Sequence, residues 1–108
     1  MKRGEIWLVA GGAYARKPRP AIILQDDLFD ATDSVTVCPL TSALVDAPLL
    51  RVTIPADERS GVREPSAAMI DKVTTLRRAN VGDRIGELTP KQMVDVERRL
   101  LVFLGIAR

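Results

Sequence analysis

Short apolar runs alternate along this chain with polar segments that contain glycine and proline. Runs of this length that are rich in Val, Ile, Thr and Trp are typical of strands. The runs that predict strands are 4–9, 21–25, 35–40, 49–54, 66–75 and 85–88. The segments 10–18, 26–34 and 55–65 predict loops, and 77–83 predicts a short turn or helix.

The C-terminal segment has the pattern of an amphipathic helix. Thr89 suits the N-cap, Pro90 suits the first helical position, and Gln92 completes a capping box. The apolar residues at helical spacing are Met93, Val96, Leu100, Phe103 and Leu104, and Gly105 ends the segment. Several short strands followed by one helix predict a mostly β domain, a small antiparallel barrel or sheet with the helix covering one face.

Two predicted strand ends carry polar side chains suited to binding a phosphate. Arg19 stands just before the run 21–25, and Thr41 stands just after the run 35–40. About nine residues join these runs, whereas a parallel crossover needs about a dozen or more, so antiparallel pairing is favoured. Arg19 and Thr41 are therefore expected at one edge of the sheet, where a guanidinium beside a hydroxyl can hold a phosphate.

Composition places the chain in a broad class. At 108 residues, with 46% hydrophobic and 28% charged residues, it predicts one globular domain spanning 1–108. The net charge of +2 permits a nucleic-acid partner without requiring one. No apolar run approaches the roughly 20 residues of a membrane span. The segment 1–5 lacks the apolar region of a signal peptide, and a single cysteine excludes an internal disulfide, so we expect a cytoplasmic protein without a membrane partner.

The chain has no histidine, which is the commonest acid–base residue and the commonest metal ligand. With Cys38 as its one cysteine, a structural zinc site is not expected, and Cys38 itself lies mid-strand as an inert buried side chain. The aspartates of 26–34 raise the alternative of a Mg²⁺ site. They are more typical of a solvated turn, so we expect no metal and no cofactor.

Several segments together resemble the MazF/PemK toxin endoribonucleases of type II toxin–antitoxin systems. They are RGEIW (3–7), RPAIILQDD (19–27), VCPLTS (37–42), IDKVTTL (70–76) and IGEL (85–88), and with the terminal helix they span nearly the whole chain. The resemblance implies an SH3-like antiparallel barrel of the CcdB/PemK-like kind with a C-terminal α-helix, and a homodimer. It also implies sequence-specific, metal-independent cleavage of single-stranded RNA and inhibition by a cognate antitoxin, MazE-like or other.

Metal-independent RNA cleavage uses the 2′-hydroxyl as nucleophile and leaves 2′,3′-cyclic phosphate and 5′-hydroxyl ends. Arg19 matches the family's catalytic arginine, and its fork would grip the phosphate; the alternative is a solvated loop arginine. Thr41 matches the catalytic Thr or Ser and would donate to the scissile phosphate; the alternative is a hydroxyl bonded to its own backbone. Asp71 matches an aspartate that some members are thought to use as base or acid with a raised pKa. Its alternative is a structural pair with a nearby arginine.

The chain departs from the family pattern at two places. Met69 replaces an arginine, which leaves the general acid and base unassigned, and the first loop is shorter than usual. In that loop Tyr14 could stack a base or pack in the core, and Arg16 and Lys17 could hold phosphates or be solvated. The further RNA-binding candidates, each with a structural or solvated alternative, are Gln25, Ser42 and Lys72.

A second function on the same scaffold is a CcdB-like toxin that binds gyrase and lacks nuclease activity. The terminal Gly105-Ile106 after an apolar helix is faintly similar to such proteins. An inactive relative that only binds its antitoxin is a third alternative. The Arg-Pro and Thr-Ser motifs favour the nuclease.

Overall fold

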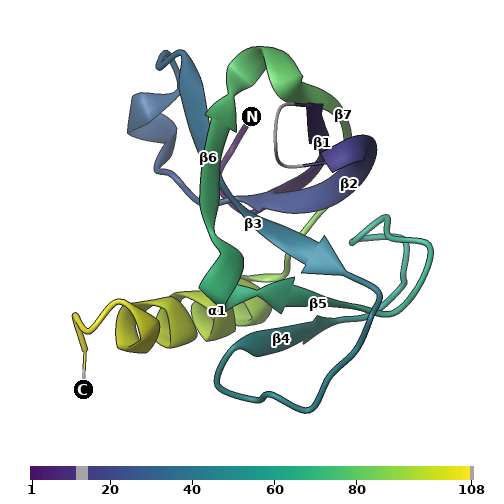
Figure 1. Cartoon of the computed structure of the whole chain (residues 1–108), viewed down its shortest axis with the longest axis vertical. Helices are drawn as coiled ribbons and strands as arrows, with labels where there is room; N and C mark the ends of the chain where they lie inside the picture. Colours follow the sequence, from purple (N-terminus) through teal and green to yellow (C-terminus); the bar gives the residue numbers. More distant parts are fainter. Residues whose placement is uncertain (12–14, 108) are drawn as a thin grey trace.

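The computed structural model describes residues 1–11 and 15–107. The strands are β1 (Glu5–Gly11), β2 (Ala15–Ile23), β3 (Ser34–Thr41), β4 (Arg51–Ile54), β5 (Ser66–Met69), β6 (Thr74–Arg77) and β7 (Val81–Glu87). The helical elements are the short 3₁₀ turns η1 (Asp27–Phe29), η2 (Ile70–Lys72) and η3 (Arg78–Asn80), and the α-helix α1 (Pro90–Phe103). The order is that of a mostly β protein with a C-terminal helix, as the sequence predicts (Figure 1).

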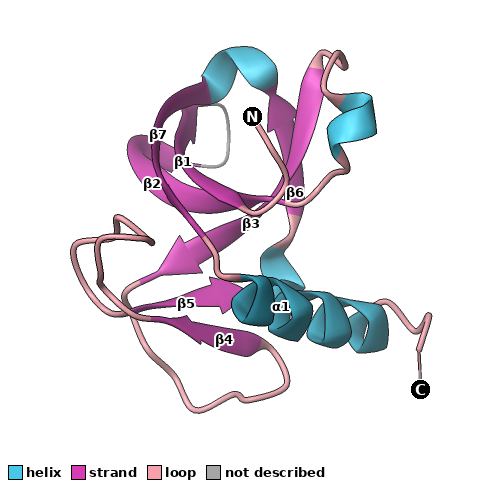
Figure 2. Ribbon diagram, turned by 180° about the vertical axis from the view of Figure 1, so that it is seen from behind, coloured by secondary structure: helices cyan, strands magenta, loops and turns pink. Residues whose placement is uncertain are grey.

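All strand pairs of the described chain are antiparallel. The sheet has the order β4-β5-β3-β2-β1-β7. The remaining strand, β6, pairs with residues 34–37 of β3, whereas β5 pairs with residues 40–41 of the same strand. In this part of the chain the end strands β4 and β7 do not pair with each other, so the strongly curved sheet stays open where the sequence predicts a closed barrel as one possibility. The helix α1 lies across one end of this sheet, next to β4 and β5 (Figure 2).

Residues 21–23 of β2 and residues 37–40 of β3 are buried on both faces, which explains why these stretches are continuously apolar. On β2, Ile22 faces a core that contains Met93 and Val96 of α1, while Ala21 and Ile23 face a second, smaller core. The same alternation along β3 sends residues 35 and 37 to the smaller core and residues 38 and 40 to the larger one. The sheet therefore separates two apolar clusters, of which the larger is covered by α1.

The N-terminus of α1 has the predicted capping box. The Gln92 amide donates to Thr89 Oγ1 at 3.1 Å, and the Thr89 amide donates to Gln92 Oε1 at 2.7 Å. Pro90 occupies the first turn, and Gly105 follows the helix with a φ of 75°. None of the helices in the described ranges is both long and apolar enough to cross a membrane.

Three of the predicted segments differ from the structure. The run 66–75 is not one strand, because η2 interrupts it and the chain changes its pairing along β3 at that point. The predicted loop 10–18 is already β2 from Ala15 onward, and the predicted turn 77–83 contains both η3 and the start of β7. In the last two segments strand pairing overrides local turn propensity, whereas in the first a change of pairing partner breaks an apolar run.

Candidate active site

An open cleft of about 1450 Å³ lies beside the ends of β2 and β3. Its lining comes from residues 17–20 of β2, residues 39–43 at the end of β3, residues 61–64 of the β4–β5 loop, and residues 72–74 after β5. Figure 1 shows the arrowhead of β3 pointing toward the β4–β5 loop, which forms one side of the cleft. Segments far apart in the sequence thus meet at one site.

Arg19 and Thr41 both line this cleft. The predicted antiparallel pairing of their strands is confirmed, with Ala21 opposite Pro39. Ala21 and Pro39 form the last pair of this ladder, and the residues just beyond it on each strand, up to Arg19 and Thr41, continue along the wall of the cleft. The Arg19 side chain is exposed and, among the described residues, makes no hydrogen bond or ion pair. Its guanidinium is therefore available to an anion in the cleft.

The Thr41 hydroxyl is held by its own backbone. The amide of Ala43 donates to Thr41 Oγ1 at 3.1 Å, so the expected local hydrogen bond is present. This bond uses a lone pair of the oxygen and leaves the hydroxyl proton free to donate. The contact consequently orients the hydroxyl without preventing it from binding a phosphate oxygen.

The cleft is predominantly basic. Lys17, Arg19, Arg63 and Lys72 line it, together with the hydroxyl-bearing Ser42. Among the described lining residues, Glu64 is the one carboxylate. A concave surface whose charged side chains are mainly cationic attracts polyanions. Of the predicted RNA-binding residues, the structure thus brings Lys17, Ser42 and Lys72 to the same cleft as Arg19 and Thr41.

Asp71 belongs to a different contact. Its Oδ1 accepts a hydrogen bond from Arg51 Nη1 at 2.6 Å, and it is not among the residues that line the cleft. The Arg51 hydrogen bond holds the pKa of the Asp71 carboxyl below its ordinary value, against a smaller opposing effect of burial. The expectation of a raised pKa is wrong, because β4 places Arg51 opposite Met69 and so within reach of η2. The alternative of a pair with a nearby arginine is confirmed.

Gln25 has a structural contact outside the cleft. Its Nε2 donates to the carbonyl of Phe29 at 2.9 Å, and its Oε1 accepts from the amide of Thr36 at 3.0 Å. These bonds tie the η1 turn to β3. Tyr14 lies outside the described residues, and for Arg16 the structure describes the backbone alone, within β2.

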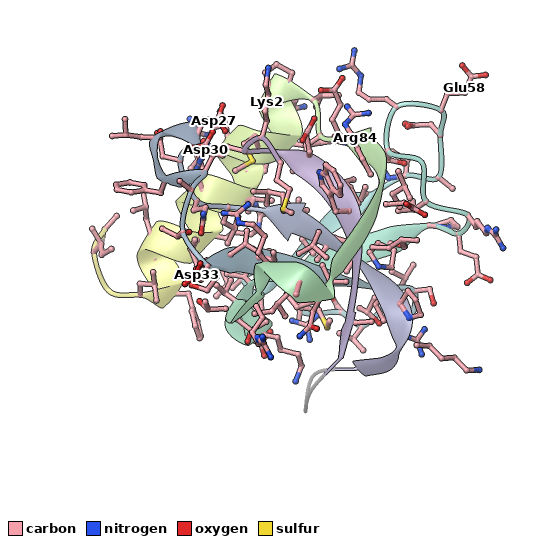
Figure 3. All side chains as sticks on the ribbon, turned by 90° about the horizontal axis from the view of Figure 1, so that it is seen from above. Lys2, Asp27, Asp30, Asp33, Glu58 and Arg84 are labelled. Carbon is pink, nitrogen blue, oxygen red and sulfur yellow. The ribbon has the colours of Figure 1, made fainter. Side chains whose placement is uncertain are left out.

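The aspartates between β2 and β3 form a turn at the surface. Asp26 accepts from the amide of Leu28 at 2.9 Å and so caps η1, and Asp27 accepts from the amide of Arg3 at 2.7 Å. Figure 3 shows Asp27, Asp30 and Asp33 spread along this segment, and no group of three or more potential metal ligands occurs in residues 1–11 and 15–107. Cys38 is buried, as expected, and burial raises the pKa of its thiol to about 12.

Comparison with known proteins identifies the family. The family model described as "PemK-like, MazF-like toxin of type II toxin-antitoxin system" matches residues 2–104. The chain belongs to this family. It is 53% identical over 108 residues to the "Probable endoribonuclease MazF" of Mycolicibacterium smegmatis, covering 99% of both chains. The resemblance inferred from the motifs is thereby confirmed.

Solved structures of MazF toxins share the fold. The Mycobacterium tuberculosis toxin MazF-mt6 superposes with a TM-score of 0.83 at 22% identity, over 96% of this chain and 99% of that one. A MazE–MazF complex from Deinococcus radiodurans gives 0.79 at 24% identity, over 99% and 98% of the respective chains. The mostly β fold with a C-terminal helix is thus that of the MazF/PemK toxins.

In this PemK-like toxin the β4–β5 loop is held firmly against β7. A Cβ on Gly86 would overlap the backbone of Ser60, and a Cβ on Gly61 would overlap the backbone of Ile85. The buried Ser60 hydroxyl donates to the carbonyl of Pro55 at 2.7 Å, and the Glu87 amide donates to the carbonyl of Arg59 at 2.9 Å. The sequence predicts this segment only as a loop, and the glycines at 61 and 86 are the signal that two backbones approach closely.

Proposed function

We propose that this chain is the toxin of a type II toxin–antitoxin system and acts as a sequence-specific endoribonuclease on single-stranded RNA, with mRNA as its substrate. The observation that carries the proposal is the meeting of Arg19 and Thr41 in a basic cleft of a chain that belongs to the PemK-like, MazF-like toxin family. The relative from Mycolicibacterium smegmatis, which bears the name of an endoribonuclease, supports it.

The proposed reaction begins with attack of a ribose 2′-oxygen on the adjacent phosphorus. The new P–O2′ bond forms as the P–O5′ bond breaks, so the products are a 2′,3′-cyclic phosphate and a 5′-hydroxyl. Arg19 stabilises the charge that develops on the phosphorane, and the Thr41 hydroxyl donates to a non-bridging oxygen. The 2′-proton leaves to a base and the 5′-oxygen receives a proton. DNA is not a substrate, because it lacks the nucleophile.

The remaining residues of the cleft bind the RNA backbone in this proposal. Lys17 and Lys72 hold phosphates on either side of the reacting one, and Ser42 supplies a further hydrogen bond. Asp71 keeps its structural partner Arg51 and takes no part in proton transfer. The reaction requires no metal ion and no cofactor, so it proceeds in EDTA.

The test is cleavage of a long single-stranded RNA by the purified protein in EDTA, with sequencing and chemical analysis of both new ends. We expect fragments with a shared sequence at the cut, cyclic phosphates and 5′-hydroxyls. Arg19→Ala and Thr41→Val should each lower the rate roughly 100- to 1,000-fold, as the loss of one transition-state donor does. Arg98→Ala, which removes an exposed arginine of α1 outside the cleft, is the control. Full activity of Arg19→Ala would contradict the assignment.

The proposal includes a cytoplasmic homodimer and a cognate antitoxin, MazE-like or of another family. One solved relative is an "Endoribonuclease in complex with its cognate antitoxin" from a mycobacterial species. An acidic antitoxin tail would fold across the basic cleft and exclude RNA. Removal of that tail should abolish inhibition, and unchanged inhibition would contradict this mode of inhibition.

The comparisons give the gyrase-binding alternative no support. Deletion of residues 105–108 separates the two functions, because it should leave nuclease activity largely intact.

A further inference from the structure

Glu64 differs from the other charged residues of the cleft because its negative charge does not favour a phosphate ligand. Four cationic side chains line the cleft, at positions 17, 19, 63 and 72, and Glu64 is the one carboxylate among the described lining residues. A carboxylate repels the phosphates that these cations attract. It is compatible with bound RNA only where it meets hydrogen-bond donors, and in a nucleic acid those donors are on the bases and the 2′-hydroxyls.

The Glu64 side chain is free to make such a contact. It is exposed, and it makes no hydrogen bond or ion pair with another residue of the described ranges. Its backbone is fixed, since Ser66 Oγ donates to the Glu64 carbonyl at 2.8 Å. The loop before it is packed against β7 through Gly61. A free carboxylate on an anchored backbone is suited to selecting a ligand.

Glu64 lies in the same cleft as Thr41, near the start of β5, which pairs with the end of β3. Ala67 pairs with Thr41 across β5 and β3. The Cα atoms of Glu64 and Ala67 are three residue steps apart along the chain, a span of at most about 11 Å. Thr41 and Ala67, as cross-strand neighbours, are about 5 Å apart. The Cα atoms of Glu64 and Thr41 are thus at most about 16 Å apart, which keeps Glu64 within reach of a nucleotide next to the one whose phosphate Thr41 would bind.

We propose that Glu64 recognises a guanine beside the cleaved bond, an inference that rests on the proposed ribonuclease function. The open Watson–Crick edge of guanine presents two adjacent donors, N1–H and the 2-amino group, which match the two oxygens of one carboxylate. Adenine and cytosine place a ring acceptor beside their amino group, and uracil flanks its single N–H with two carbonyls. Guanine is therefore the base that pairs with Glu64 through two hydrogen bonds.

The experiment combines a protein variant with a changed base. The preferred cleavage site is first read from the ends of RNA fragments made by the wild-type protein, with a guanine expected at a fixed position beside the cut. Oligonucleotides of that sequence are then made with guanine, inosine, 7-deazaguanine or adenine at this position. Inosine lacks the 2-amino donor, whereas 7-deazaguanine keeps both donors. Each is cleaved by the wild type, by Glu64→Gln and by a control, Glu58→Gln.

Glu58 is a suitable control because it is an exposed carboxylate of the same loop that does not line the cleft. Figure 3 shows its side chain pointing outward at the edge of the molecule. For the wild type and Glu58→Gln we expect guanine and 7-deazaguanine to be cleaved equally and inosine more slowly. Glu64→Gln should lower the preference for guanine over adenine roughly 5- to 100-fold and remove the difference between guanine and inosine.

Three outcomes would overturn the proposal. One is a wild-type cleavage pattern without a fixed guanine, and another is an unchanged guanine preference in Glu64→Gln. In the third outcome, Glu64→Gln cleaves RNA much more slowly but keeps the preference for guanine, and the acidic limb of its pH–rate profile is lost. That result would make Glu64 the general base. Binding of the same oligonucleotides, measured by fluorescence anisotropy, tests guanine recognition separately. If the wild type cleaves no RNA yet loses its guanine-selective binding through Glu64→Gln, the proposed nuclease activity fails and the recognition stands.

Discussion

The ion pair between Arg51 and Asp71 allows a quantitative test of how β4 supports η2, and through η2 one wall of the cleft. Arg51 Nη1 lies 2.6 Å from Asp71 Oδ1 and 2.9 Å from the carbonyl of Leu50, to which the amide of Ile70 also donates at 3.0 Å. The pair and this backbone bond fasten η2 to the start of β4. Because Lys72 is the last residue of η2 and lines the cleft, loosening of this attachment should also weaken RNA binding.

The size of the effect follows from the partial burial of the two groups. Exposed ion pairs contribute about 0.2–1 kcal/mol, and breaking a fully buried pair costs about 3–5 kcal/mol. The Arg51 side chain is 15% exposed and that of Asp71 is 28% exposed, so the pair lies between these limits and nearer the lower one. Asp71→Asn should cost about 1.5 kcal/mol, since it leaves the more buried guanidinium unpaired while its Nε already lacks a partner. Arg51→Met, which keeps the apolar stem, should cost about 1 kcal/mol.

The assay is urea unfolding of the wild type, both single variants and the double variant. We expect a coupling energy of about 1 kcal/mol at pH 7. For Asp71→Asn a loss of 1.5 kcal/mol corresponds to a Tm lower by roughly 6–12 °C in a domain of this size. A coupling energy below about 0.3 kcal/mol, within the usual error of additivity, would refute the argument. In that case the backbone bond and the burial of Ile70 would hold η2 without help from the pair.

The pH dependence gives an independent check. Because the folded-state pKa of Asp71 is lowered, its contribution to stability is present above the unfolded pKa of about 3.9 and is lost as the pH falls through the folded pKa. The difference between wild type and Asp71→Asn should stay constant from about pH 5 to 8 and shrink below about pH 4. The pKa of Glu5 is lowered as well, but Glu5 is present in both proteins and cancels from the difference. A difference that does not shrink in acid would contradict the assigned ion pair.

Three further results are expected. Gly86→Ala should lower the free energy of unfolding by at least about 2 kcal/mol, because its Cβ would overlap the backbone of Ser60. Gly82→Ala, whose Cβ would lie 3.5 Å from the nearest atom, should lower it by less than half as much in the same thermal unfolding assay. Equal losses would contradict the close approach. Thr89→Ala should lower the free energy of unfolding by about 1 kcal/mol through loss of the N-cap, and a change within error would show that the cap is redundant. The Cys38 thiol, with a pKa raised to about 12, should not react with a thiol reagent at pH 8 until the protein is unfolded in urea; fast labelling of the native protein would contradict its burial.

Local patterns in the sequence were sufficient for the features that depend on neighbouring residues. The capping box at Thr89 and Gln92 involves residues three apart, and the pairing of β2 with β3 follows from a short connection. The antiparallel register then brought Arg19 and Thr41 to one cleft, because strand direction alone decides which ends meet. These parts of the fold and site could be predicted without knowledge of the rest of the chain.

Features that depend on distant segments could not be predicted in this way. Asp71 pairs with an arginine 20 residues earlier, and no local pattern in the sequence indicates that contact. The break of the predicted strand 66–75 at η2 reflects a change of partners along β3, while the apolar run itself continues through Ile70. Glu64 was missed for the same reason, since an acidic residue in a polar loop has meaning only when the basic residues of other segments surround it.

The two glycine contacts between the β4–β5 loop and β7 have a consequence for the thermodynamics of RNA binding. Gly61 and Gly86 allow the loop backbone to lie directly on β7, so this wall of the cleft is ordered when the protein folds. Its conformational entropy is then lost during folding rather than during association, which raises affinity for any ligand that fits. Exchanges at positions 63 and 64 on this fixed wall would change which RNA is bound while leaving the entropy of binding nearly constant. The scaffold can therefore acquire new sequence preferences through side chains alone.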